Sequence, residues 1–189
     1  AYDLKANINS KIKIRNKNKQ IISNGYFNID NFTINLAGLK LPESKIHFTS
    51  KGTKVNLDTD LYITNEEKIS VLGMLNYGSK PATDIKITSN EIHINNVINL
   101  IKATLDSLHI KHELNPIIGE GIFTADTYIK TDFKKLNSNG NIKIKNCIIK
   151  NKDKNLKLAK INSIISLDNS ILKFIDTSLE IAETIFKID

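Results

Sequence analysis

The stretch of sequence that decides the fold is Ser23-Asn24-Gly25-Tyr26-Phe27-Asn28-Ile29-Asp30-Asn31-Phe32-Thr33-Ile34, because the chain contains it in two related copies. The second copy begins 115 positions later and reads Ser138-Asn139-Gly140-Asn141-Ile142-Lys143-Ile144-Lys145-Asn146-Cys147-Ile148-Ile149. The same offset relates Lys45-Ile46 to Lys160-Ile161. A repeated run of alternating strands indicates a structure that grows by the addition of strands.

The repeat continues with a small change of register. Asp58-Thr59-Asp60-Leu61 corresponds to Asp176-Thr177-Ser178-Leu179 after the offset has grown by three positions. We therefore interpret residues 1–189 as a single β-rich domain, or as a fragment of a longer protein, with an internal repeat over 23–75 and 138–189. The alternation typical of a strand is present at both ends of the sequence, so we expect the chain to be a fragment of a longer protein.

Apolar and polar residues alternate through most of the chain, which predicts about eleven short strands. We expect the strand around Phe27 to end near Asp30-Asn31 and another to begin at Phe32, and we interpret Ser178–Phe186 as strand although its spacing also fits a short helix. Alternation favours an antiparallel sheet with one apolar and one solvated face. The apolar positions that we expect to form a core or to line a groove are Phe27, Ile29, Val55, Leu57, Leu61, Ile63, Phe123, Ala125, Ile129, Ile142, Ile144 and Ile148.

One segment changes its period, within an insert of about residues 92–116. Its apolar residues step by three and four, which is typical of an amphipathic helix that packs on a sheet. These helix-packing residues are Ile94, Val97, Ile98, Ile101, Leu105 and Leu108. The fold class that we predict is α+β and mostly β. It is a curved antiparallel sheet of repeated strands, shaped as a groove, a taco or an open barrel, with one helix packed on it.

The charge of the chain is basic but does not indicate a nucleic acid partner. The net charge is +7, and Arg15 is the only arginine among the 27 basic residues. Proteins that read nucleic acids usually rely on arginine for bidentate contacts. Since the lysines are spread along alternating strands, we interpret them as solvated side chains and expect no nucleic acid partner.

The sequence contains no motif that predicts catalysis. Asp58 and Asp60 share one face of a strand, but their counterparts at 176–178 include only one acid, so an acid–base pair is not expected. Gly119-Glu120-Gly121 lacks the Lys-Ser/Thr of a phosphate loop. Cys147 lies in an alternating strand without a nearby histidine, which indicates a small, partly buried apolar residue. We predict no enzyme activity, no catalytic residues and no cofactor.

His109-Ile110-Lys111-His112, followed by Glu113, is the most metal-like cluster in the chain. Two imidazoles three positions apart can share one face of a helix. No third ligand is evident, so we interpret the cluster as exposed polar residues at a helix end and predict no metal site.

No apolar run reaches the roughly 20 residues that span a bilayer, and no signal peptide is visible.

The repeated segments resemble the C-terminal portion of AsmA-like proteins. In that family a glycine-led strand precedes short aliphatic strands, and a helical insert precedes a Gly-x-Gly strand. The segments of this chain that carry the resemblance are Gly140–Lys150, Leu156–Ile161, Ile171–Phe174, Thr177–Ile181, Ile94–Leu108 and Gly119–Phe123. It covers residues 90–189 and reaches the first half of the chain through the internal repeat.

The resemblance implies a protein of the Gram-negative cell envelope. Its parent would be anchored in the inner membrane and would extend into the periplasm, and its apolar groove would shelter phospholipid acyl chains on their way to the outer membrane. The family provides no catalytic residues. The ligand that it implies is a phospholipid or another molecule with acyl chains.

Two functions follow from these observations. The first is a non-enzymatic segment for lipid transport or for assembly of the outer membrane. The alternative is a β-rich interaction or scaffold module with a packed core and no lipid, whose partner is an envelope protein or a neighbouring segment of the parent chain. Periodicity does not distinguish them, because it does not show what an apolar face contacts.

Overall fold

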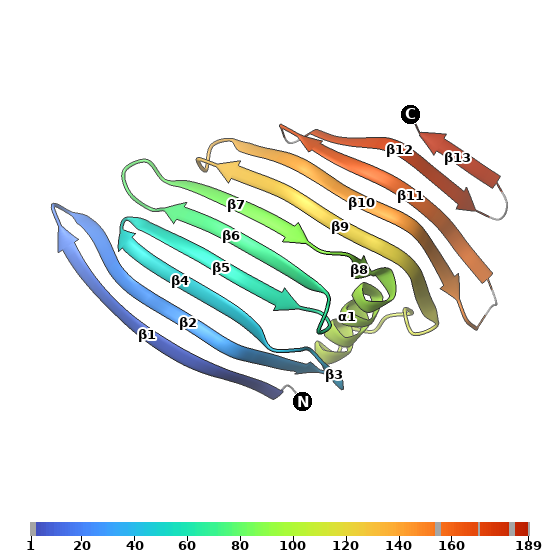
Figure 1. The fold of residues 1–189 in the computed structure, drawn as a ribbon, viewed down its shortest axis with the longest axis horizontal. Helices are drawn as coiled ribbons and strands as arrows, with labels where there is room; N and C mark the ends of the chain where they lie inside the picture. The colour runs from blue at the N-terminus through green and yellow to red at the C-terminus, as the bar shows by residue number, and fades with distance from the viewer. Residues whose placement is uncertain (1–2, 154–155, 170, 182–183, 189) are drawn as a thin grey trace.

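The computed structural model describes residues 3–153, 156–169, 171–181 and 184–188, and these ranges hold thirteen strands and one helix (Figure 1). The helix is α1 (Ile94–Ser107). The strands are β1 (Asp3–Lys17), β2 (Gln20–Leu36), β3 (Leu39–Lys40), β4 (Ser44–Gly52), β5 (Lys54–Tyr62), β6 (Lys68–Asn76), β7 (Ala82–Ser89), β8 (Ile92–His93), β9 (Ile117–Thr131), β10 (Leu136–Asn151), β11 (Leu156–Asp168), β12 (Ile171–Ile181) and β13 (Thr184–Ile188).

All of these strands belong to one antiparallel sheet. Its order is β1-β2-β4-β5-β6-β7-β9-β10-β11-β12-β13, with β3 added to β2 and β8 added to β9. The strands follow one another in the sheet in the order of the chain, apart from the short strands β3, which pairs with β2 and not β4, and β8, which pairs with β9 and not β7. The sheet does not close, and β1 and β13 are its edges in the described part of the chain. The predicted fold class is therefore confirmed in its open form.

The described residues of Ser178–Phe186 are strand rather than helix, because β12 runs to Ile181 and β13 begins at Thr184, and positions 182 and 183 lie outside the described residues. The expected break after Asp30-Asn31 is wrong. β2 is 17 residues long and continues through this point, with an irregularity in its pairing between Ile29 and Phe32. Asn31 there has a positive φ of 50°, a conformation that asparagine tolerates better than most residues. The strand bends at a bulge instead of ending.

The register assigns each side chain to one of two faces. Residues that pair across antiparallel strands project to the same side, and successive residues alternate between sides. One row of paired residues crosses six strands and consists of Phe27, Phe48, Leu57, Gly73, Ile85 and Ile129. The rings of Phe27 and Phe48 lie with their centroids 6.3 Å apart. The row shows that one face of the sheet is apolar across β2 to β9.

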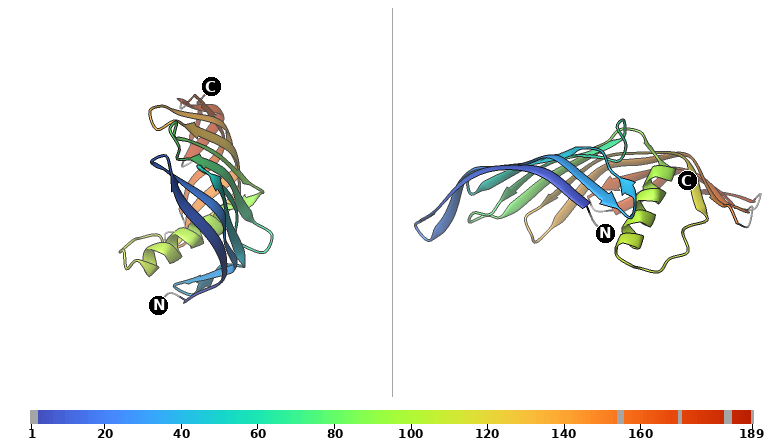
Figure 2. Two further views of the ribbon diagram at one scale, coloured as in Figure 1. Left: turned by 90° about the vertical axis from the view of Figure 1, so that its left-hand side faces the viewer. Right: turned by 90° about the horizontal axis from the view of Figure 1, so that it is seen from below.

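The apolar face is the concave one. Figure 2 shows that the sheet is arched and that α1 projects from the inner side of the arch. Gly119 of β9 also lies on the apolar face. It pairs with Ile149 of β10, and Ile149 shares this face with Cys147 because the two residues are two positions apart in the same strand. A side chain at Gly119 would meet the side chains of Ile94 and Ile98 at 2.6 and 2.7 Å, so α1 packs directly on the backbone there. We call the two sides the concave and the convex face.

The helix fills the concave side at one end of the strands. It contacts β9 and β8 on one flank and β2 and β3 on the other, although β4 to β7 separate these strands in the sheet. Ile94 and Ile98 pack as expected. The expectation that Ile101 and Leu108 pack is wrong, because they are 45% and 57% exposed. The C-terminal part of α1 leads away from the sheet in Figure 2, which explains their exposure.

The buried core is small. Among the described residues, only Ile92, Ala103 and Cys147 are buried hydrophobic side chains. The chain exposes 12467 Å², whereas a compact monomer of this mass exposes about 9,100 Å². The excess of about 3,400 Å² is larger than the total area that a standard protein interface buries. The sheet therefore has a single layer, and its apolar face lacks a second layer of the same chain.

Candidate functional site

The concave face is the candidate site because it gathers nearly all of the apolar residues that the sequence singles out. Ten of the twelve predicted groove or core residues lie on it. They are Phe27, Ile29, Val55, Leu57, Leu61, Phe123, Ala125, Ile129, Ile142 and Ile144. Most are partly exposed rather than buried, since no other layer covers them.

Ile148 is a correction to the predicted set. Its parity matches Ile142 and Ile144, but β10 has an irregularity between Ile144 and Cys147 at which Asn146 adopts a φ of 50°. Ile144 pairs with Ser163 and Cys147 with Ile161, so the extra residue moves Cys147 to the concave face. Ile148 pairs with Lys160 and lies on the convex face. A bulge reverses the sidedness of all positions that follow it.

Ile63 also lies outside the concave row. It follows the end of β5, and its N–H donates to the carbonyl oxygen of Glu67 at 2.8 Å. With Leu41, Pro42 and Tyr62 it lines a cavity of about 700 Å³ between the β2–β4 and β5–β6 connections. This cavity opens at the end of the sheet that holds α1 and does not extend the concave face.

The sequence-based set missed much of the concave face. The register adds Leu4, Ile8, Ile12, Ile14, Ile34, Ile46, Phe48, Ile69, Val71, Leu75, Ile85, Ile87, Ile165, Leu172 and Phe174. Those of β1 are the most open, since Leu4, Ile8 and Ile14 are each more than 60% exposed. The same period-two signal marks them, so the alternation was sufficient to find them. The face spans about 50 Å from β1 to β13 at the usual strand spacing.

Polar residues on the concave face are small and are shielded by their neighbours. Thr59, Thr127, Ser163 and Thr177 are each less than 9% exposed. The hydroxyls of Ser163 and Thr177 bond to each other at 2.7 Å, and the Oγ of Ser44 accepts the N–H of Tyr62 at 2.9 Å. These side chains are short and nearly buried, and Thr59 Oγ1 has no hydrogen-bond partner among the described residues, so the face presents few polar atoms to a ligand. The arrangement suits an apolar ligand.

The convex face carries ion pairs. Lys45 lies 3.2 Å from Asp60 and 3.7 Å from Asp58, and Lys68 lies 3.5 Å from Asp60. Burial alone would raise the pKa of Asp60, but the hydrogen bonds from Ser70 and Lys45 and the lysine charges hold it below its ordinary value. The two aspartates therefore act as partners of lysines on a solvated surface. Surface pairs of this kind contribute about 0–1 kcal/mol each.

His112, near the end of α1, has structural partners. His112 Nε2 lies 3.0 Å from a carboxylate oxygen of Asp106, and His112 Nδ1 accepts the N–H of Leu114 at 3.2 Å. Within the described residues, no group of three or more His, Cys, Asp or Glu side chains has the arrangement of a metal site. Burial raises the pKa of the Cys147 thiol, which favours its protonated form over the nucleophilic thiolate.

The start of α1 is tied to the β5–β6 connection by Glu67, whose side chain is buried. One carboxylate oxygen accepts the N–H and the ring Nδ1 of His93, and both oxygens accept the side-chain amide of Asn96 at 2.9 Å. Burial alone would raise the pKa of Glu67, but these hydrogen bonds and the charge of His93 hold it below its ordinary value. Lys102 donates to the carbonyl of Ile117 and thereby holds the other flank of the helix.

The chain matched no family model, no curated protein and no solved structure. Among the described residues, no helix has the length and apolar character that crossing a bilayer requires.

Proposed function

We propose that the concave face binds the acyl chains of phospholipids and that the chain is a lipid-handling segment of a cell-envelope protein. The observation that carries the proposal is the single apolar face that continues from β1 to β12 without a second layer over it. Exposed apolar surface of this extent marks an interaction site in a stable protein. The small and nearly buried hydroxyls on this face are compatible with a hydrocarbon ligand.

The energetics favour a ligand with long apolar chains. Each buried methylene contributes about 0.8 kcal/mol, so ten methylenes in contact with the face contribute about 8 kcal/mol before the cost of ordering the chain. The side chains that line the face are mainly aliphatic and accept methylenes without a fixed register. A row such as Val55, Leu57 and Leu61 offers such contacts along a single strand.

The resemblance to AsmA-like proteins supports the same proposal of a lipid-handling segment. It would assign the segment to the periplasm of a Gram-negative bacterium, with a parent anchored in the inner membrane, and to phospholipid transport or outer-membrane assembly. The non-enzymatic role is part of this proposal, since Asp58, Asp60 and His112 have structural partners.

Two adjacent residues of β6 provide a matched test. Val71 pairs with Thr59 and Ile87 on the concave face, whereas Leu72 pairs with Asp58 and Lys86 on the convex face. We expect Val71→Lys to weaken binding of a fluorescent fatty acid at least about tenfold and Leu72→Lys to leave it unchanged. Thermal unfolding of both variants shows whether they are folded. Equal affinity in the two variants, or no lipid extracted from the purified wild-type protein, would contradict the proposal.

A second candidate function is protein interaction through the sheet edge. Strand β1 has 15 residues and one neighbour, β2, and nearly all of its described side chains are exposed. A long free edge can accept a further strand from a partner chain. Concentration-dependent association that Val71→Lys does not change would favour this function over lipid binding.

A further inference from the structure

We propose that the rim of the sheet formed by the hairpin turns contains a subsite for the anionic head group of the lipid, at a cavity between the β1–β2 and β6–β7 turns. This inference rests on the proposed function, because it assumes that the acyl chains lie on the concave face. It adds the orientation of the ligand and the charge of its head group. Figure 1 shows the β1–β2, β4–β5, β6–β7, β9–β10 and β11–β12 turns together at one end of the strands, and α1 with the other connections at the opposite end.

The cavity has a volume of about 540 Å³ and is lined by Asn18, Lys19, Gln20, Ile21, Tyr77, Gly78 and Ser79. It has one apolar side chain of note, Ile21, which is 60% exposed and lies on the concave face. The other lining groups include the Lys19 ammonium, two side-chain amides and hydroxyls. A site with polar donors at one end and an aliphatic wall at the other matches an amphiphile.

The β6–β7 turn is held beside this cavity by hydrogen bonds of Tyr77 and Asn76. Tyr77 Oη donates to the carbonyl of Gly52 at 2.8 Å and accepts from Ser23 Oγ at 2.8 Å. The side chain of Asn76 bonds to the N–H of Gly78 at 3.1 Å and to Thr53 Oγ1 at 3.0 Å. Ser23 lies on the concave face, so the turn leans over the inner side of the rim. The cavity wall is therefore preorganised.

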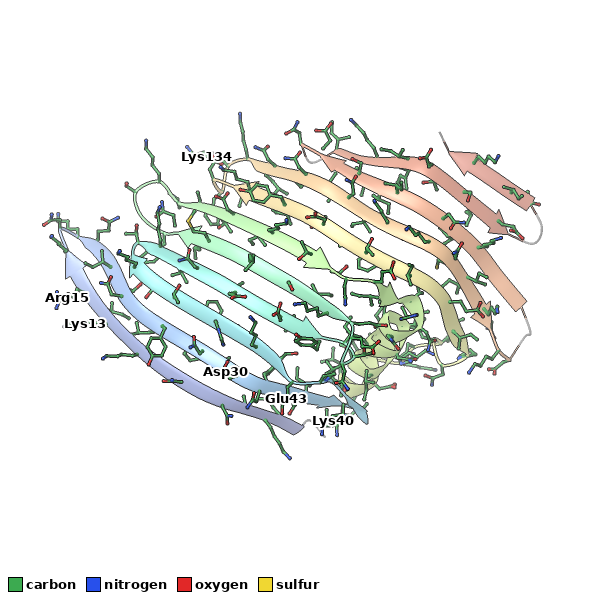
Figure 3. The ribbon with its side chains drawn as sticks, in the orientation of Figure 1. Lys13, Arg15, Asp30, Lys40, Glu43 and Lys134 are labelled. Atoms are coloured by element: carbon green, nitrogen blue, oxygen red, sulfur yellow. The ribbon has the colours of Figure 1, made fainter. Side chains whose placement is uncertain are left out.

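The charge around the cavity has one sign. The three nearest turns, residues 17–20, 51–54 and 76–82, contain five lysines and no acidic residue. These lysines are Lys17, Lys19, Lys51, Lys54 and Lys80, and all are exposed. Among the described residues none of the five forms an ion pair. Arg15 and Lys13, labelled in Figure 3, add to the positive charge at the same end of β1.

The rest of this rim continues the pattern. The β9–β10 turn contributes Lys134 and Lys135, and its acid, Asp132, already accepts the backbone N–H groups of both at 2.9 and 2.8 Å. Asp168, before the next turn, pairs with Lys173 at 2.9 Å. Lysines that outnumber the acids at the edge of an apolar surface attract phosphate groups.

The opposite rim has a different charge. Over residues 36–44, 62–68, 89–117 and 151–153 the described chain holds five lysines and seven acidic residues. Figure 3 shows Lys40 and Glu43 close together on that side. Since α1 also occupies the concave side there, the open and basic end of the face is the end with the turns. An anionic head group is thus favoured at one end alone.

The test compares two short-chain lipids that share acyl chains and differ in head group. Dioctanoyl-phosphatidylglycerol is anionic and dioctanoyl-phosphatidylcholine is zwitterionic, and both are used as monomers below their micellar concentration in titration calorimetry. We expect the anionic lipid to bind at least about tenfold more tightly at low salt, with the preference falling at high salt. The double variant K19Q/K80Q should remove this preference and leave phosphatidylcholine binding unchanged.

The matched control is K111Q/K152Q, which removes the same charge from exposed lysines of the opposite rim. It should retain the full preference. Equal binding of the two lipids by the wild type, or an equal loss in the control, would overturn the subsite while leaving the proposed function standing. Binding of neither lipid would overturn both. Binding of glycerophosphoglycerol, which has no acyl chains, with the affinity of the anionic lipid would also overturn the coupling to the concave face.

Discussion

Asn31 of β2 and Asn146 of β10 hold the same backbone conformation, with φ of 50° in each, at a bulge six residues after a glycine. The preceding glycines, Gly25 and Gly140, also share an extended conformation with positive φ, 146° and 134°. In both places the strand approaches its neighbour so closely that a side chain on the glycine would collide with backbone. Each copy of the sequence repeat thus has a glycine where the strand approaches its neighbour closely and an asparagine at a bulge six residues later. The bulge bends the strand and contributes to the curvature of the concave face.

The first prediction concerns these glycines. In Gly25→Ala the added Cβ would lie 1.8 Å from the Lys11 carbonyl oxygen, and in Gly140→Ala 2.2 Å from that of Asp126. We expect each substitution to lower the free energy of unfolding by about 3 kcal/mol or more, as measured in urea. Gly38→Ala is the control, since Gly38 has a φ of 92° with no atom near its added Cβ. It should cost only the backbone strain, about 1–2 kcal/mol, and an equal cost at all three positions would refute the role of close approach.

The second prediction concerns the contact between α1 and Gly119 of β9. Gly119→Ala places a methyl group 2.6 Å from Ile94 and 2.7 Å from Ile98, so we expect α1 to be displaced from β9. Amide hydrogen exchange within residues 94–107 should accelerate at least about tenfold, while exchange in β4 and β5 remains unchanged. Gly73→Ala is the matched control, because its nearest neighbours would be at 3.6 Å. Unchanged exchange in α1 would mean that the contact does not position the helix.

The third prediction is a pH dependence of the helix anchor. The pKa of Glu67 is lower in the folded chain than its usual value of 4.5. The carboxylate therefore stabilises the fold above pH 4.5, and this contribution is lost as the pH falls through the lower folded pKa. We expect Glu67→Gln to cost about 1–3 kcal/mol at pH 7 and less near pH 3, as measured by urea unfolding.

The neighbouring Glu66→Gln serves as its control, because Glu66 is exposed and its backbone rather than its side chain takes part in the connection. Its effect should stay within about 0.5 kcal/mol at both pH values. A cost for Glu67→Gln that does not change between pH 7 and pH 3 would show that the ionised form has no special role.

The fourth prediction concerns Cys147. The side chain is 4% exposed, and burial raises its thiol pKa. Iodoacetamide at pH 8 should therefore modify the native protein at least about a hundredfold more slowly than the protein in 8 M urea. Mass spectrometry of the modified fraction over time gives both rates. Rapid modification of the native chain would indicate that β10 and β11 open readily at this point.

Much of the architecture was predictable from local pattern. Alternating residues such as Val55, Leu57 and Leu61 predicted strands with one apolar face, and the spacing of Ile94 and Ile98 predicted the helix. These predictions succeed because a side chain's direction depends only on the period of its own element. The sidedness of Ile148 was not predictable in this way, because the bulge at Asn146 inverts the parity that the sequence displays.

The sequence by itself determined the elements and the apolar character of one face. Only the tertiary structure decided that this face stays open and that the lysines of distant hairpins, such as Lys19 and Lys80, gather at one rim. Whether an apolar face is covered depends on how strands and layers assemble over the whole chain, and a local pattern is the same in both cases. The rim arises because an antiparallel meander brings every second connection to the same end of the sheet.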